Sequence, residues 1–188
     1  MGCVNSRAVA PQVDGPGVLG LDVERDVELV LAFLNTRDVD RGTDVLSDPE
    51  QWRRWCANRR IGEAPEVRTV HAYRDAMRAA VADGALSEVV VDRPWAVEVE
   101  LRHGVPVLVG TDALGEVLAA ATGLVRTGHW SRIKICPADD CLWAFYDRSR
   151  NRSRTWCSMR ICGNREKARS WRERHTAETP AVQVAPGS

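Results

Sequence analysis

The chain has 188 residues, 44% of them hydrophobic, and its 26 Lys and Arg residues balance 26 Asp and Glu residues. This composition allows a sizeable core and excludes an intrinsically disordered chain. No apolar run approaches the roughly 18 residues of a membrane-spanning helix, and no signal peptide is recognisable. We therefore expect a soluble, cytoplasmic protein without a membrane partner.

The zero net charge hides an uneven distribution along the chain. Residues 1–125 contain 13 basic and 20 acidic residues, whereas residues 126–175 contain 13 basic and 5 acidic residues. An acidic part joined to a basic part indicates two units with different partners. The predicted division is a loose leader (1–17), a helical domain (18–126), a basic module (127–175) and a disordered tail (176–188).

The acidic part has the spacing of amphipathic helices, with apolar residues recurring at steps of three and four. Four helices are predicted there, starting at Leu21, at Asp48, near Pro65 and at Thr111. Asp48 is placed as an N-cap with Pro49 in the first helical position. The third helix should stop at Asp83-Gly84 and the fourth at about Arg126.

Between the third and fourth helices the period changes to two. The stretch WAVEVELRHGVPVLVG, residues 95–110, alternates apolar and polar residues and has a turn at His103-Gly104. This pattern is typical of a β-hairpin. The acidic part is therefore predicted to be mainly α with a small β-hairpin, an α+β fold.

The six cysteines are unevenly distributed. Cys3 and Cys56 have no close neighbour, while the others form the pattern Cys136-x4-Cys141-x15-Cys157-x4-Cys162. Two short thiol pairs joined by a linker are typical of a tetrahedral zinc site, with each sulfur about 2.3 Å from the ion. Since four protein ligands leave no position for water or substrate, we expect one structural Zn²⁺. The alternative is four buried cysteines without a ligand.

The surroundings of the cysteines complete the predicted finger. A helix starting after Cys162 should direct the backbone N–H groups of residues 163–165 at the sulfurs. The linker LWAFYDRSRNRSRTWC suggests two short strands around a turn at residues 149–152. Its aromatic residues would cover the metal or simply form core: Trp143, Phe145 or Tyr146, and Trp156. The module is predicted as a zinc-ribbon or treble-clef-like finger ending in a basic helix.

A helical wheel of that last helix places Ala168, Trp171 and His175 on one face, an apolar stripe with basic residues beside it. Basic residues of the linker and the helix are the candidate contacts to nucleic-acid phosphates. They are Arg148, Arg150, Arg152, Arg154, Arg165, Lys167, Arg169 and Arg172. The alternative is that their stems pack along the apolar stripe and their charged heads remain in water.

Residues 129–174 resemble the CGNR zinc finger, named after the motif found here at residues 162–165, through the stretches FYDRSRN and WCSMRICGNR. LAFLNTRD and DVLSDPEQWRRWC are similar to the ABATE domain that usually precedes this finger, and the whole resemblance covers about residues 18–174. It implies a mostly bacterial family described as stress-induced transcription regulators. It also implies DNA binding through the finger, with the four late cysteines (Cys136, Cys141, Cys157 and Cys162) as metal ligands.

Other motifs support no second activity. GPGVLG at residues 15–20 fits a dinucleotide-binding pattern but lacks a preceding strand, and MGCVNS fits a myristoylation pattern that a bacterial chain would not use. The four histidines are scattered, and no catalytic constellation is present. We therefore predict no enzyme, no catalytic residue and no cofactor besides zinc. Cys56, beside two tryptophans, is interpreted as a core residue rather than a redox sensor.

The preferred hypothesis is a zinc-dependent, DNA-binding transcription regulator of the bacterial cytoplasm, associated with the nucleoid and with the stress response. Its acidic domain would sense a small molecule, form a homodimer or mask the basic finger. The alternative is an adaptor that binds other proteins through a purely structural zinc finger.

Overall fold

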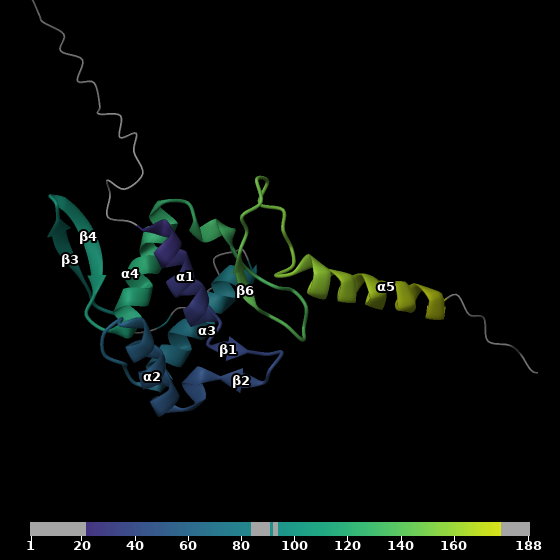
Figure 1. Ribbon diagram of the computed structural model, residues 1–188, viewed down its shortest axis with the longest axis horizontal. Coiled ribbons are helices and arrows are strands. Elements are labelled where there is room, and N and C mark those ends of the chain that lie inside the picture. The colour runs from purple at the N-terminus through teal and green to yellow at the C-terminus, as the bar shows by residue number, and fades with distance from the viewer. Residues whose placement is uncertain (1–21, 84–90, 92–93, 178–188) are drawn as a thin grey trace, which may run out of the picture.

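The computed structural model describes residues 22–83, 91 and 94–177 (Figure 1). The predicted leader, the MGCVNS and GPGVLG motifs, Cys3 and the tail from residue 178 lie outside the described residues. Among the described residues, no helix combines the length and apolar character needed to cross a bilayer.

The four helices predicted for the front part are present: α1 (Val23–Leu34), α2 (Pro49–Arg59), α3 (Val67–Asp83) and α4 (Ala113–Arg126). Aspartates at three helix starts accept a backbone N–H from the first turn, at 2.8 to 3.0 Å. They are Asp22, Asp48 and Asp112. These caps satisfy donors that a helix start leaves unpaired, so local sequence determines where the helices begin.

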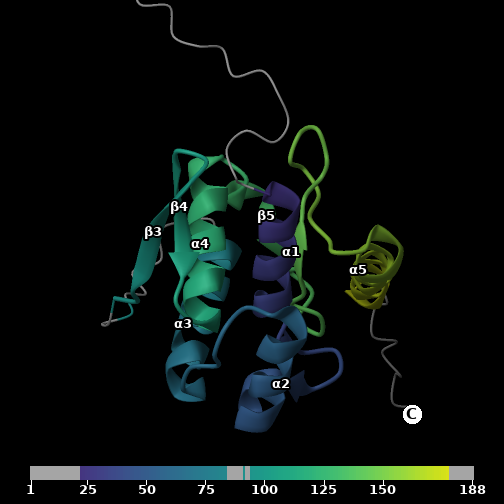
Figure 2. The same ribbon diagram turned by 60° about the vertical axis from the view of Figure 1, so that its left-hand side comes forward.

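The core of the front part lies between these helices. α1 and α4 lie side by side (Figure 2). Phe33 is fully buried on α1 and Leu114 on α4, while Trp52 stacks on Trp55 within α2, with ring centroids 5.0 Å apart. Val125, near the end of α4, is instead exposed. The predicted amphipathic pattern thus produces one buried cluster with a well-defined outer surface.

The predicted hairpin consists of β3 (Val97–Arg102) and β4 (Val105–Gly110), paired antiparallel. His103 and Gly104 both have positive φ angles, 53° and 80°, as a two-residue turn between twisted strands requires. Gly110 touches α4 so closely that a Cβ atom there would lie 1.9 Å from the backbone nitrogen of Glu116. The absence of a side chain at Gly110 therefore allows the hairpin to join α4.

A second small hairpin, β1 (Arg37–Asp38) with β2 (Thr43–Asp44), was not predicted. Two-residue strands carry no periodicity that a sequence can reveal. The hairpin is held by the buried guanidinium of Arg74 on α3, which donates to both carboxylate oxygens of Asp44 at 2.5 and 2.8 Å. Its position therefore depends on a tertiary contact.

The strands of the finger differ from the prediction. β6 (Ala144–Tyr146) pairs with β5 (Ile133–Ile135), which comes directly before Cys136. Residues 147–157 contain no strand. Of the two strands expected around residues 149–152, the first is therefore present as β6 and the second is absent. The carboxylate of Asp147 is fully buried and accepts the backbone N–H groups of Ser149 and Arg154, both at 2.9 Å. These side-chain bonds hold the segment as a loop in place of a strand ladder.

The β5–β6 hairpin joins the finger to the front part. Ile133 and Ala144 belong to the same buried cluster as the front helices. The side-chain amide of Asn35 donates to the carbonyl of Ala144 at 2.9 Å and accepts its N–H at 2.8 Å. Arg78 donates to the carbonyls of Leu34 and Leu142, both at 2.6 Å. Packing and hydrogen bonds thus cross the boundary predicted near residue 126.

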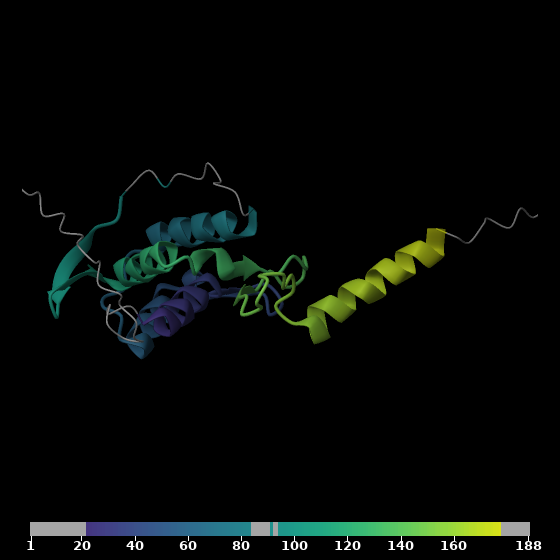
Figure 3. The ribbon, with the colours of Figure 1, turned by 90° about the horizontal axis from the view of Figure 1, so that it is seen from above.

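The chain ends in a π-helical turn (Met159–Gly163) followed by α5 (Asn164–Ala177), which runs two residues into the segment predicted as tail. Seen from above, α5 extends away from the body (Figure 3). Ala168 and His175 are exposed, and Trp171 keeps 54% of its surface in contact with solvent. The alternative in which this stripe is buried is therefore wrong for the described residues, because α5 extends away from the body.

Candidate metal centre and basic surface

The four late cysteines come together in space. Their Sγ atoms all lie within 4.8 Å of one another. Cys136 and Cys141 come from the loop between β5 and β6, Cys157 from the loop after β6, and Cys162 from the π-helical turn. The cluster therefore joins two chain segments that enter it from different directions.

The spacing of the sulfurs fits one tetrahedral metal ion. Cys157 Sγ lies 3.5 Å from that of Cys141 and 3.6 Å from that of Cys162, and all four thiols are free. A tetrahedron with metal–sulfur bonds of about 2.3 Å has edges of about 3.8 Å. The four cysteines could therefore bind a single ion, and among the described residues no other group of histidines, cysteines and carboxylates does so.

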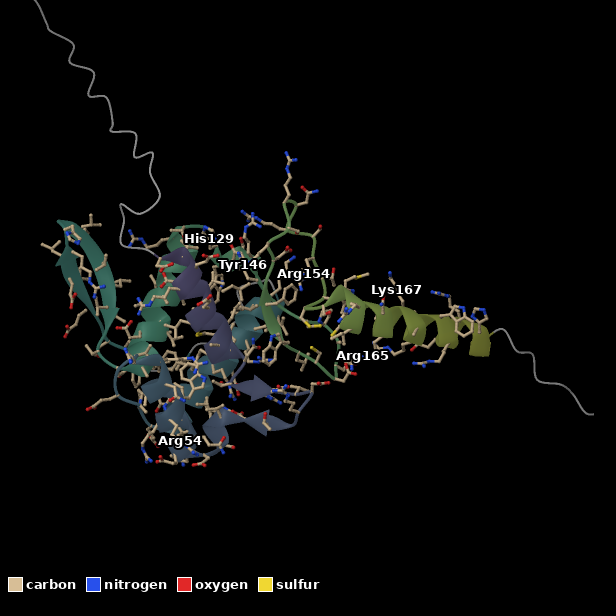
Figure 4. All side chains as sticks on the ribbon, in the orientation of Figure 1. Arg54, His129, Tyr146, Arg154, Arg165 and Lys167 are labelled. Atoms are coloured by element: carbon tan, nitrogen blue, oxygen red, sulfur yellow. The ribbon has the colours of Figure 1, made fainter. Side chains whose placement is uncertain are left out.

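The cluster has a small apolar shell of its own. Phe145 and Trp156 pack against the cysteines, as the prediction for the aromatic residues allowed. Tyr146 instead packs on the front core, where its hydroxyl lies 2.5 Å from His129 Nδ1 (Figure 4). Trp143 is exposed. Only some of the candidate aromatics therefore cover the sulfurs.

The predicted hydrogen bonds from backbone N–H groups to sulfur are wrong for two residues. The N–H of Gly163 donates to the carbonyl of Ser158 at 3.1 Å, and that of Asn164 donates to carbonyls of the π-helical turn. The tight turn uses its own carbonyls as acceptors, so these donors are not available to the thiols.

A side chain takes that role instead. Arg165 donates from Nη2 to Cys162 Sγ at 3.6 Å, and its Nη1 lies 2.7 Å from Asp140 Oδ2. Burial alone would raise the pKa of Cys162, but hydrogen bonds from Cys157, Cys141 and Arg165 outweigh it and hold that pKa below its usual value. Arg165 thus lies beside the cysteine cluster and supplies positive charge where four thiolates would gather.

The loop after β6 is organised around Asp147. Lys134 Nζ lies 2.7 Å from this carboxylate and also donates to the carbonyls of Arg152 and Arg154, at 2.6 and 2.9 Å. Burial would raise the pKa of Asp147, but hydrogen bonds from Lys134, Ser149 and Arg154 hold it well below its usual range. This buried ion pair therefore shapes the loop that carries most of the candidate arginines.

Three of the four candidate arginines in this loop make contacts within the protein. Arg154 donates to the carbonyls of Trp156 and Cys157 and lies over the Phe145 ring, 5.0 Å from its centroid. Arg148 pairs with Glu24 of α1 at 3.3 Å, and Arg152 donates to Ser131 Oγ at 2.9 Å. Arg154 therefore supports the chain next to Cys157 (Figure 4), while the exposed side chain of Arg150 points to solvent.

The basic residues of α5 lie on two sides of the helix. Arg165, Arg169 and Arg172 line one hollow of about 200 Å³ together with Asp140, so they share a face as predicted. Arg169 also pairs with Glu166 on its own helix. Lys167 is exposed near the base of α5 (Figure 4). The helix therefore combines a side turned toward the cysteine loop with a side open to solvent.

Several residues that position the site were missed in the sequence. Asn35, Arg74, Arg78 and Asp147 all make tertiary polar contacts, and none belongs to a recognisable local motif. Cys56 is confirmed as a core residue, 1% exposed, and burial raises its pKa to about 12. At neutral pH its thiol is therefore protonated and a poor nucleophile.

Two protein families match the chain. Residues 28–131 match the ABATE family, described as "Putative stress-induced transcription regulator", and residues 132–175 match the CGNR zinc finger. Neither is an enzyme family. No curated protein matches the chain. The two matches occur in the predicted order and meet at η2 (Trp130–Arg132), the short turn before β5.

Proposed function

The chain belongs to the ABATE family and carries a CGNR zinc finger, and we propose that it is a zinc-dependent, DNA-binding transcription regulator. The observation that carries this proposal is the basic helix α5, which stands clear of the body and is attached to it beside the cysteine cluster. The proposed place of action is the nucleoid of the bacterial cytoplasm, in a response to stress.

Zinc is the metal that this donor set favours. Four thiolates in a tetrahedron are typical of structural zinc, and soft sulfur ligands do not favour magnesium or calcium. Cys136, Cys141, Cys157 and Cys162 would hold the ion, and Arg165 would offset part of the negative charge of the four thiolates. The role of the ion would be to fix the angle at which α5 leaves the finger.

The proposed DNA contacts follow from which basic side chains reach solvent. A 14-residue helix is about 21 Å long and fits the major groove of DNA. The candidates assigned to phosphates are the exposed side chains of Arg148, Arg150, Arg152, Lys167, Arg169 and Arg172. Arg154 and Arg165 are assigned mainly to holding the cysteine loop, because their guanidinium groups bond to it.

The proposal is tested by measuring the affinity of the zinc-loaded full chain for random-sequence duplex DNA at several salt concentrations. We expect a steep loss of affinity with salt, and Lys167→Ala should lower the slope of log K against log salt by about 1. Arg54→Ala removes an exposed basic residue of α2, away from α5 (Figure 4), and should leave the slope unchanged. A flat response in the zinc-loaded protein would overturn the proposal.

A second arm separates the role of Arg165 from direct DNA contact. Arg165→Ala should make a chelator remove the metal faster, because the variant loses the bond to Cys162 and the pair with Asp140. Lys167→Ala should leave metal retention unchanged. If both variants retain metal equally, Arg165 does not support the cluster.

One observation favours the adaptor as a second candidate. Met159, Ile161 and Trp171 expose more than half of their surfaces along the π-helical turn and α5. Exposed apolar side chains of this size are typical of protein-binding surfaces. Under this alternative, Trp171→Ala would abolish binding to a protein partner while DNA affinity stayed low and insensitive to salt.

The front domain is proposed to sense a small molecule. A groove of about 590 Å³ lies between α1, α2 and β6, and its lining includes Trp55, Arg59, Trp143 and Arg148. Because it touches both the front helices and the finger, a bound molecule would alter how they pack. Masking of the finger would act through the Glu24–Arg148 pair, but both side chains are largely exposed, so this contact is weak.

A further inference from the structure

The β3–β4 hairpin has an apolar face that the described part of the chain does not cover. Val107 is buried on the side of α4, where it lines a cavity with Ala119 and Ala120. On the opposite face, Val99 and Leu101 are 65% and 76% exposed. Residues paired across the hairpin share a face, so the outer face consists of the exposed Val99, Leu101 and Pro106 and the half-buried Val97 and Leu108.

The same hairpin has one open edge. The pair next to a two-residue turn, here Arg102 and Val105, exchanges hydrogen bonds, and bonded pairs then alternate along the ladder. The backbone groups of Val99 and Leu101 therefore point away from β4. Pro106 lies at a position whose N–H would point outward from β4, so β4 has a proline on its own outer edge. β3 is the edge that can accept another strand.

We propose that a second copy of this chain occupies this edge, with β3 pairing antiparallel to β3 of the other copy about a two-fold axis. Glu98, Glu100 and Arg102 alternate with the apolar residues of the strand. When Glu98 lies opposite Arg102 of the other copy, Val99 lies opposite Leu101 of that copy. The two-fold axis then produces two ion pairs and two apolar pairs.

The charges and the length of the paired segment together select this register. Pairing Glu100 with Arg102 of the other copy would also form two ion pairs, but it would pair only residues 100–102 of the six-residue strand, whereas the favoured register pairs residues 98–102. Shifting the pairing so that Glu98 lies opposite Glu100 would place like charges face to face twice, which destabilises a sheet. In the favoured register Glu100 meets its own copy at the axis, where Arg102 of the same chain already pairs with it at 3.2 Å. The resulting sheet has four strands, and its outer face joins the apolar residues of both hairpins.

The arrangement leaves the finger free. The hairpin and α5 lie at opposite ends of the long axis of the molecule (Figure 1). A dimer formed through β3 therefore keeps both basic helices at its two ends. This proposal does not rest on the proposed DNA binding. Its test contains no nucleic acid, so the two proposals can fail separately.

The test is sedimentation velocity of the zinc-loaded full chain over a wide range of concentrations. We expect a reversible dimer, and Leu101→Lys should weaken it about tenfold, because both apolar pairs with Val99 of the other copy would be lost and each is worth up to about 1 kcal/mol. Val125→Lys alters another exposed apolar residue, on α4 outside the hairpin, and should leave the dimer unchanged. Circular dichroism confirms that both variants are folded, which is expected because both side chains are exposed.

Charge reversal tests the register. Glu98→Arg alone should weaken the dimer by placing two arginines opposite each other, and adding Arg102→Glu should restore it. A monomer at every concentration, a dimer insensitive to Leu101→Lys, or a dimer weakened as much by Val125→Lys would each overturn the proposal. If Arg102→Glu fails to rescue Glu98→Arg, the proposed pairing of β3 with β3 in this register is overturned.

Discussion

The front helices and the finger are held together by different interactions. The front part buries large side chains such as Phe33, Leu34 and Trp52 in one cluster. The cluster at the metal centre contains only Cys136, Ala138, Phe145 and Cys162 as buried residues. Burial of apolar surface can stabilise the first region by itself, whereas four buried residues are too few for the second. The finger therefore depends on polar contacts and, in the proposed function, on metal coordination.

The boundary between the two kinds of stabilisation lies within the finger. β5 and β6 pack into the front core, and Asn35 bonds both backbone groups of Ala144. Beyond Tyr146, the loop is shaped by Asp147 and leads to the cysteine cluster and α5. The comparison teaches that one half of the matched zinc finger is anchored by packing, whereas the other half contains the cysteine cluster that the proposed metal ion would hold together.

The largest effect that would test this comparison is removal of the metal. Chelation, or Cys157→Ser, should unfold the chain from about Asp147 through α5 while α1 to α4 remain folded. Structural zinc contributes roughly 10 to 16 kcal/mol in isolated fingers, and a helix shorter than about 15 residues is marginal by itself. Hydrogen exchange should show lost protection in α5 and retained protection in the front helices.

The control for metal removal is Cys56→Ser, which alters a cysteine of the front core and should retain the metal. Unchanged protection of α5 in chelated protein would contradict the comparison. Loss of protection in α1 to α4 would contradict it in the other direction, because the front core would then also need the metal.

A smaller effect is expected from Asp147→Asn. In either orientation the new amide would direct N–H donors at other donors: at Lys134 Nζ and the Arg154 N–H in one, and at the Ser149 N–H in the other. Removing one partner of a buried ion pair costs about 3 to 5 kcal/mol. Urea denaturation followed by tryptophan fluorescence measures this loss.

The matched control is Asp139→Asn, because that side chain is 91% exposed and lies in the same module. It should change the free energy of unfolding by less than about 0.5 kcal/mol. An equal effect of the two substitutions would mean that the loop is not organised by the buried carboxylate.

The smallest effect concerns acid stability of the front part. Burial would raise the pKa of Asp44, but hydrogen bonds from Arg74 and Leu46 hold it below its usual value. A carboxyl group whose pKa is lowered by folding stabilises the protein above its unfolded pKa, near 4, and this contribution disappears as pH falls through the lower folded pKa. Denaturation curves from pH 6 to acid should show this loss in wild type and less of it in Asp44→Asn. A parallel loss in both proteins would assign the acid sensitivity to other groups.

Much of the fold could be predicted because its signals are local. Asp48 and Pro49 begin α2, and the alternation around His103-Gly104 produces the β3–β4 hairpin. The spacing of Cys136, Cys141, Cys157 and Cys162 brought them together as expected. Capping, periodicity and ligand spacing act over a few residues, so they can be read without knowing the packing.

The sequence by itself therefore determined the helices, the large hairpin and the grouping of four thiols that could bind one metal ion. Only the tertiary structure decided that β6 pairs with β5, that Arg165 bonds to Cys162, and that α5 stands free with Trp171 exposed. These features depend on which surfaces meet after residues distant in the chain have packed together. Asn35 and Ala144, for example, are 109 positions apart, and no local pattern encodes a contact of that kind.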